Sequence, residues 1–156
     1  MRLLLPVILV VLAAADSSSL HIESQQQWSQ RVVSGDFATL VHFKSGMCKS
    51  CQEFEPEWTK ITQVVHGVRF ASVDIDRPFG LKLAKNFGVL DEGIPNLRIF
   101  GASKPKGVPV FFGEGQASVI VPKINKALKN DSALRMNGEA RMYMRVNPKK
   151  ATKTEL

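Results

Sequence analysis

The stretch Val41-His-Phe-Lys-Ser-Gly-Met-Cys-Lys-Ser-Cys-Gln-Glu-Phe-Glu-Pro-Glu-Trp58 decides how this chain is interpreted. Its beginning belongs to an apolar, β-rich run over residues 37–43, which is typical of a buried central strand. A helix is predicted to begin at Cys48, because Phe54 and Trp58 open a series of apolar residues at the spacing of one buried helical stripe. The stretch therefore predicts a strand, a short turn and an amphipathic helix that starts with two cysteines.

Cys48 and Cys51 are the only cysteines of the chain. A disulfide between them closes so short a loop that it would stabilise the fold by only about 2 kcal/mol. A structural zinc site would need two more ligands, and none of the three histidines, His21, His42 and His66, lies at a familiar spacing from the pair. A redox pair fits better, since a helix N-terminus stabilises the thiolate of the first cysteine and the second lies one turn further on. We therefore expect a redox-active pair and no metal.

Strand and helix patterns alternate on both sides of this stretch. Asp76 is expected to cap the helix that follows the third strand. The expected elements are a short strand and a helix capped by Ser24 within residues 20–33, a strand over 37–43, a helix over 48–66, a strand over 68–75, a helix over 78–87, a loop after residue 89, strands over 96–100 and 108–112, and a helix over 119–128. This order predicts an α/β fold with a central mixed β-sheet flanked by helices.

Two separated motifs resemble those of the thioredoxin and protein disulfide isomerase family. The Cys-Lys-Ser-Cys segment, with Pro56 inside its helix and Trp58 after it, is similar to the family's active-site segment. Ile94-Pro95, followed by a strand, is similar to the family's cis-proline loop. The resemblance covers about residues 20–130 and implies a thioredoxin fold.

The resemblance also implies roles for individual residues. Cys48 and Cys51 would be catalytic and would carry the electrons themselves, so that no other cofactor is expected. Met47, Ile94 and Pro95 would contact an extended segment of the substrate.

Several positions depart from the family pattern. Met47 stands where the family usually has tryptophan, and Lys49-Ser50 replaces its usual dipeptides. Glu114 stands where isomerase domains bring an arginine towards the second cysteine. His42 occupies the position of a buried acid that takes the proton of that cysteine. His42 is either a neutral, buried histidine hydrogen-bonded to a neighbour or a substitute proton acceptor for Cys51.

The two ends of the chain carry predictions about its location. Residues 1–15 combine one arginine, an apolar run and an Ala-Ala-Ala site, as a secretory signal peptide does. Its cleavage would leave no membrane span, whereas an uncleaved signal anchor is the alternative. The last four residues, Lys-Thr-Glu-Leu, are similar to the signal bound by the KDEL-type retrieval receptor of the endoplasmic reticulum. The expected organisation is a signal peptide over 1–15, a thioredoxin-like domain over 16–130 and a basic flexible tail over 131–156.

The formal net charge of +7 comes from 21 basic and 14 acidic residues. Residues 131–156 contain six basic and three acidic side chains, so the body of the chain is nearly balanced. We therefore expect no nucleic-acid partner. The resemblance and the two ends together predict a thiol–disulfide oxidoreductase or isomerase of the endoplasmic reticulum lumen, acting on cysteine-containing proteins of the secretory pathway. The alternative is a lumenal substrate-binding or chaperone module with a slow or vestigial redox pair.

Overall fold

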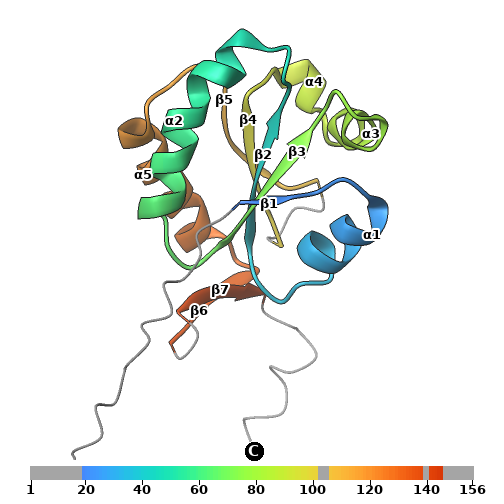
Figure 1. Ribbon diagram of the computed structural model, residues 1–156. Helices are drawn as coiled ribbons and strands as arrows, with labels where there is room; N and C mark the ends of the chain where they lie inside the picture. Colours follow the sequence, from blue (N-terminus) through green and yellow to red (C-terminus); the bar gives the residue numbers. More distant parts are fainter. Residues whose placement is uncertain (1–18, 102–105, 139–140, 146–156) are drawn as a thin grey trace, which may run out of the picture.

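A central β-sheet organises the part of the chain that the structure describes (Figure 1). This computed structural model describes residues 19–101, 106–138 and 141–145 of the 156. The sheet contains, in spatial order, β1 (Leu20–His21), β3 (Arg69–Asp74), β2 (Thr39–Lys44), β4 (Asn96–Phe100) and β5 (Val108–Phe112). The first three of these are parallel, whereas β4 and β5 each run antiparallel to their neighbour. The predicted mixed sheet is confirmed.

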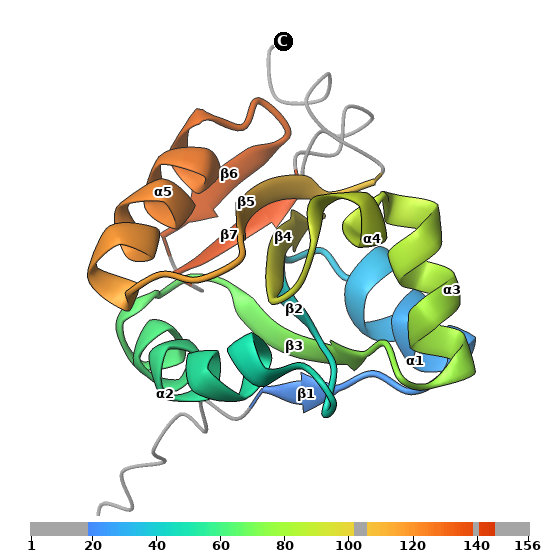
Figure 2. The same ribbon diagram turned by 90° about the horizontal axis from the view of Figure 1, so that it is seen from above.

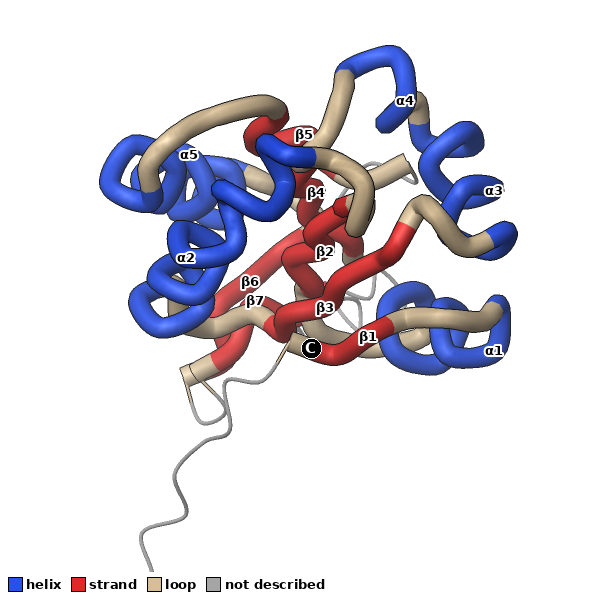
Figure 3. Tube along the Cα trace, turned by 45° about the horizontal axis from the view of Figure 1, so that its top comes forward, coloured by secondary structure: helices blue, strands red, loops and turns tan. Residues whose placement is uncertain are grey.

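Helices cover both faces of the sheet (Figures 2 and 3). One face carries α2 (Lys49–Val64) and α5 (Ala117–Asn130). The other face carries α1 (Gln25–Trp28), its π-helical continuation η1 (Ser29–Val33), α3 (Pro78–Phe87) and α4 (Val89–Glu92). The short helix α4 occupies a segment that the sequence analysis expected to be a loop.

The strand β2 lies at the centre of this sandwich and is buried on both faces. Leu40 belongs to the core beneath α2 and α5, while Val41 and Phe43 belong to the core on the opposite face. A strand covered on both sides needs apolar residues at consecutive positions, which explains the unbroken apolar run in its sequence. Because β2 ends at Lys44 and α2 begins at Lys49, the turn between them places Cys48 beyond the carboxyl end of this central strand.

The segment after α5 differs from the prediction. A hairpin of β6 (Leu134–Asn137) and β7 (Met142–Arg145) follows that helix. Leu134 is buried in the core, and the amide of Ala38 donates a 2.8 Å hydrogen bond to the carbonyl of Tyr143. The prediction of a flexible tail from residue 131 is therefore wrong as far as residue 145. Its remaining residues and the predicted signal peptide lie outside the described residues.

The N-terminus of α5 is capped by a side chain from another helix. Gln116, the residue before α5, provides no side-chain hydrogen bond to the helix. Instead, a carboxylate oxygen of Glu57 on α2 accepts a 2.7 Å hydrogen bond from the amide of Ala117. This hydrogen bond, and then the contact with Lys60, hold the pKa of Glu57 below its ordinary value. Glu57 thus links the two helices that cover one face of the sheet.

We expect Glu57→Gln to lower the urea midpoint at neutral pH and to matter less in acid. A carboxyl whose pKa is lower in the folded state stabilises the fold above its unfolded pKa, and this contribution is lost as the pH falls through the folded value. The midpoints of wild type and variant should therefore converge as the pH falls below 4.5, the ordinary pKa of a glutamate. Glu53→Gln is the matched control, since Glu53 is exposed and pairs with Lys49 only at 3.7 Å. Equal midpoints of Glu57→Gln and wild type at pH 7 would contradict the cap.

Candidate redox site

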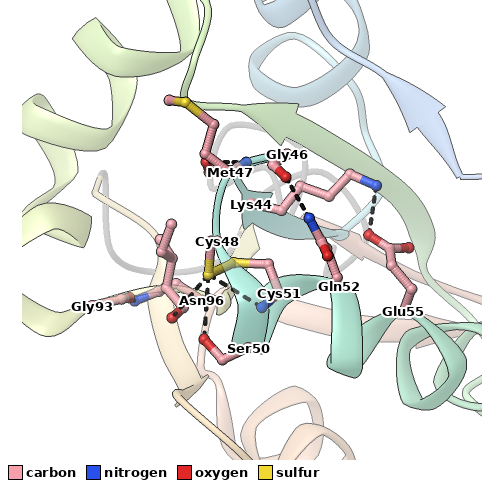
Figure 4. The surroundings of a disulfide bond; sticks show 12 residues. Lys44, Gly46, Met47, Cys48, Ser50, Cys51, Gln52, Glu55, Gly93 and Asn96 are labelled. Atoms are coloured by element: carbon pink, nitrogen blue, oxygen red, sulfur yellow. Dashed lines mark hydrogen bonds and ion pairs between the residues drawn. A yellow bond between two sulfur atoms is a disulfide. The ribbon is translucent and has the colours of Figure 1, made fainter.

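The two cysteines form a disulfide at the beginning of α2 (Figure 4). Cys48 is the N-cap residue, and its sulfur accepts a 3.1 Å hydrogen bond from the amide of Cys51. Cys48 is partly exposed, whereas only 1% of the surface of Cys51 is accessible. A second sulfur atom approaching from solvent therefore reaches Cys48, and Cys51 is placed to attack Cys48 from inside the protein.

Residues predicted from the second motif lie beside the disulfide. The carbonyl oxygen of Ile94 is 4.0 Å from the sulfur of Cys48, and the Ile94–Pro95 peptide bond is cis. The hydroxyl of Ser50 lies 3.2 Å from the same sulfur. Met47 is 85% exposed, next to the disulfide in sequence (Figure 4). The structure thus brings both motifs together around Cys48 and leaves Met47 open to solvent.

Asp76 holds the turn that precedes Cys48. The sequence analysis expected Asp76 to cap α3, but the N-cap residue is Arg77 and provides no side-chain hydrogen bond. The carboxylate of Asp76 instead accepts hydrogen bonds from the hydroxyl of Ser45 at 2.7 Å and from the amide of Gly46 at 2.8 Å. The capping prediction is wrong because a partner 30 residues earlier in the chain competes for the carboxylate. This competition leaves no local sequence signal.

A buried charge network borders the Ile94–Pro95 loop. Arg98 on β4 has a side chain only 4% exposed, and it donates a 2.6 Å hydrogen bond to Glu92 on α4. The other oxygen of Glu92 accepts a 2.9 Å hydrogen bond from the amide group of Asn96, which also contacts the carbonyl of Gly93. Glu92 therefore ties together the residues on both sides of the loop.

We expect Glu92→Gln to lower the free energy of unfolding by about 2 kcal/mol. Removing one partner of a fully buried ion pair costs about 3 to 5 kcal/mol, and the partial exposure of the Glu92 side chain reduces that cost. Urea unfolding at pH 7 measures the difference. Asp91→Asn is the matched control, because Asp91 is an exposed acid on the same helix. A midpoint for Glu92→Gln equal to that of the control would contradict the role of the pair.

His42 lies deep in the core, on the β2 face that packs against α2. Its ring centroid is 5.4 Å from that of Phe54 and 5.0 Å from that of Trp58. Neither ring nitrogen has a hydrogen-bond partner among the residues that the structure describes, in contrast to the hydrogen-bonded histidine of the first interpretation. Burial, with a smaller contribution from the charge of Lys44, lowers the pKa of His42 to about 3. A neutral imidazole follows, and so low a pKa makes it a weak acceptor for a thiol proton.

Glu114, which stands at the position of the arginine of isomerase domains, is exposed. It lines a small cavity of about 120 Å³ with Ser50 and Glu53.

Within the described ranges, no group of three His, Cys, Asp or Glu side chains is arranged to hold a metal ion. In the same ranges no helix has the length and the apolar character needed to cross a membrane.

Comparisons with known proteins agree with this geometry. The thioredoxin family model matches residues 19–126. Protein disulfide-isomerase A6 from Mesocricetus auratus is 30% identical over 117 residues, which are 74% of this chain and 26% of that protein. Protein disulfide isomerase-like 2-3 from Oryza sativa subsp. japonica is 30% identical over 115 residues, or 72% of this chain and 24% of that protein. The chain thus spans about a quarter of the length of these relatives.

Among solved structures, a mutant thioredoxin from Halobacterium salinarum NRC-1 has the same fold, with a TM-score of 0.56 and 23% sequence identity. That match covers 72% of this chain and 93% of the thioredoxin. The mixed sheet with helices on both faces is therefore a thioredoxin fold. With the family model matching more than half of its length, this chain belongs to the thioredoxin family.

Proposed function

We propose that this protein is a thiol–disulfide oxidoreductase of the protein disulfide isomerase type, acting on cysteines of secretory proteins through Cys48 and Cys51. The observation that carries the proposal is the disulfide at the N-terminus of α2, with its reachable sulfur beside the carbonyl of Ile94. The two cysteines hold the electrons, so the reaction uses no additional cofactor. The two relatives named protein disulfide isomerases support the same chemistry.

The reaction proceeds in two exchanges. In the reducing direction, the thiolate of Cys48 attacks a substrate disulfide, forms a mixed disulfide and releases one substrate thiolate. The thiolate of Cys51 then attacks the sulfur of Cys48, closes the internal disulfide and releases the second substrate sulfur. Oxidation of a substrate is the reverse sequence. The exposure of Cys48 and the burial of Cys51 fit this division of roles.

Two assays test this function on the purified protein. Reduction of insulin disulfides measures the reductase reaction, and recovery of a scrambled disulfide-bonded substrate measures isomerisation. The wild type should accelerate both, and Cys48→Ser should return both to the uncatalysed rate. A wild type no faster than Cys48→Ser in either assay would contradict the proposal.

A binding or chaperone module with a slow redox pair is the second candidate. It is favoured by His42, which stands at the position of the family's buried acid but is enclosed by aromatic rings. In that case Cys48→Ser would suppress aggregation of an unfolded substrate as well as wild type does, while the disulfide assays would show little turnover in either. The two functions are therefore separable with one variant.

We also propose that the protein acts in the endoplasmic reticulum lumen, with residues 1–15 as its signal peptide and Lys-Thr-Glu-Leu as the ligand of a KDEL-type receptor. These two sequence features support each other, since retrieval acts only on proteins that have entered the secretory pathway. The nearly balanced charge of the body of the chain supports protein partners over nucleic acid.

Deletion of residues 153–156 is expected to release most of the protein into the medium of expressing cells. The physical reason is the loss of the only segment that resembles the retrieval signal. Immunoblots of cells and medium measure the distribution, and replacement of Thr154 by Asp is the control that should retain the protein. Equal retention of the deleted and complete chains would contradict the assignment of this signal.

A further inference from the structure

A polar cavity lies behind the buried cysteine. Its volume is about 250 Å³, which is room for several water molecules, and Cys51 forms part of its wall. Figure 4 shows Lys44, Gln52 and Glu55 from this wall on one side of the disulfide, with Gly93 and Asn96 on the other side. Cys51 therefore has Cys48 and the substrate on one side. On its opposite side lies the cavity, which water can enter.

Charged and titratable groups reach this cavity from every element around it. They are His21 on β1, Glu23 after β1, Lys44 on β2, Glu55 on α2, Asp74 on β3 and Arg77 before α3. Most of them neutralise one another, since Lys44 pairs with Glu55 at 2.6 Å and Arg77 lies 3.8 Å from Asp74. The ring nitrogen Nδ1 of His21 instead lies 2.7 Å from the hydroxyl of Ser72.

The Ser72–His21 pair connects the cavity with solvent. Ser72 is only 2% exposed, on the strand next to β2, and lines the same cavity as Cys51. His21 is exposed on the edge strand β1. A hydroxyl can accept one proton while donating another, and an imidazole exchanges protons near neutral pH. His42, by contrast, does not line the cavity and is surrounded by aromatic rings.

We propose that Ser72 and His21 relay the proton of Cys51 to and from solvent through water in this cavity. The proposal rests on the proposed function, because it concerns the step in which Cys51 attacks the mixed disulfide. Cys51 transfers its thiol proton to a cavity water, which passes a proton to the hydroxyl of Ser72. Ser72 passes its own proton to Nδ1 of His21, and Nε2 releases a proton to solvent. The Cys51 thiolate then bonds to Cys48, and the electron pair of the broken bond leaves on the substrate sulfur.

A two-phase thiol assay on the full chain isolates this step. Reduced protein is mixed with the disulfide reagent DTNB, whose released thionitrobenzoate is followed by stopped-flow absorbance. The first equivalent reports attack by Cys48, and the second reports attack by Cys51 on the Cys48 mixed disulfide. His21→Gln can keep a hydrogen bond to Ser72 but cannot exchange a proton near neutral pH. It should slow the second phase about tenfold or more and flatten its dependence on pH between 6 and 8, with the first phase unchanged.

Ser72→Ala should give the same two changes, whereas His66→Gln, at another exposed histidine, should behave as wild type. Wild-type rates and pH profile in both His21→Gln and Ser72→Ala would overturn the relay. Slowing by Glu55→Gln alone would also overturn it and would assign the proton to the carboxylate. A wild type that releases a single equivalent would contradict the two-step function itself, and with it the relay. The failure of the relay changes the comparison between variants and wild type, whereas the failure of the function changes the number of equivalents that the wild type releases.

Discussion

Cys51→Ser is expected to accumulate as covalent mixed disulfides with its substrates. In the reaction that we propose, the substrate bond forms at Cys48, the partly exposed sulfur, and Cys51 breaks it from inside in the wild type. Well-oriented intramolecular reactions reach effective molarities of about 10⁵ M. Without Cys51, only a thiol from solution can release the substrate, and we expect this release to be at least about 10³-fold slower than in the wild type. The complexes should persist for hours once formed.

Gel electrophoresis without reductant, before and after treatment with dithiothreitol, measures this accumulation. The double variant Cys48→Ser/Cys51→Ser is the control and should form no reductant-sensitive complexes. Equal amounts of complex with Cys48→Ser alone would mean that Cys51 meets the substrate first, contrary to its burial. Mass spectrometry of the trapped species identifies the bound cysteine and, in cell extracts, the substrates.

His42→Leu is expected to make the protein more resistant to acid. In the folded protein the pKa of His42 is lowered to about 3, against an ordinary value of 6.5. Below pH 6.5 the unfolded chain therefore binds a proton at His42, whereas the folded chain binds it only near pH 3. The stabilisation from the neutral imidazole is complete above pH 6.5 and is lost as the pH falls towards the folded value, by about 1.4 kcal/mol per pH unit.

At pH 4.5 this single residue should lower the free energy of unfolding by about 2 to 3 kcal/mol relative to pH 7. Urea unfolding of wild type and His42→Leu at both pH values measures the effect as the difference between their pH dependences. His66→Gln controls for loss of an exposed histidine. Parallel pH dependences of wild type and His42→Leu would show that His42 accepts a proton in the folded protein.

The elements around the cysteines follow from local sequence, and the structure confirms them. The apolar run of β2 and the helical spacing of Phe54 and Trp58 are properties of neighbouring residues. The same holds for the N-cap of α1, where Ser24 accepts a 3.2 Å hydrogen bond from the amide of Gln27. Such patterns depend on contacts within a few residues, so a sequence read in order reveals them.

The parts that were not predicted depend on partners far apart in the chain. Asp76 bonds Ser45 from 31 positions away, Ser72 bonds His21 from 51, and the amide of Ala117 finds Glu57 from 60. In each case the donor and acceptor meet only after the sheet and helices have assembled. The family resemblance located Cys48 and the Ile94–Pro95 loop. It assigned no role to Asp76, Ser72 or Glu57. The hairpin of β6 and β7 differs, since its strands pair locally; its contact with Ala38, through Tyr143 and 105 positions away, is long-range.

That hairpin also fixes from which end of the molecule the chain continues. β7 pairs with the segment just before β2, through the amide of Ala38, whereas the disulfide follows the far end of β2. The six residues of β2 span about 20 Å, and Figure 1 shows β6 and β7 at the pole opposite the first turn of α2. The hairpin therefore occupies one pole of the described fold, while the partly exposed sulfur of Cys48 lies at the other. The hairpin can therefore close the base of the sheet without covering the disulfide that the proposed exchange with a client uses.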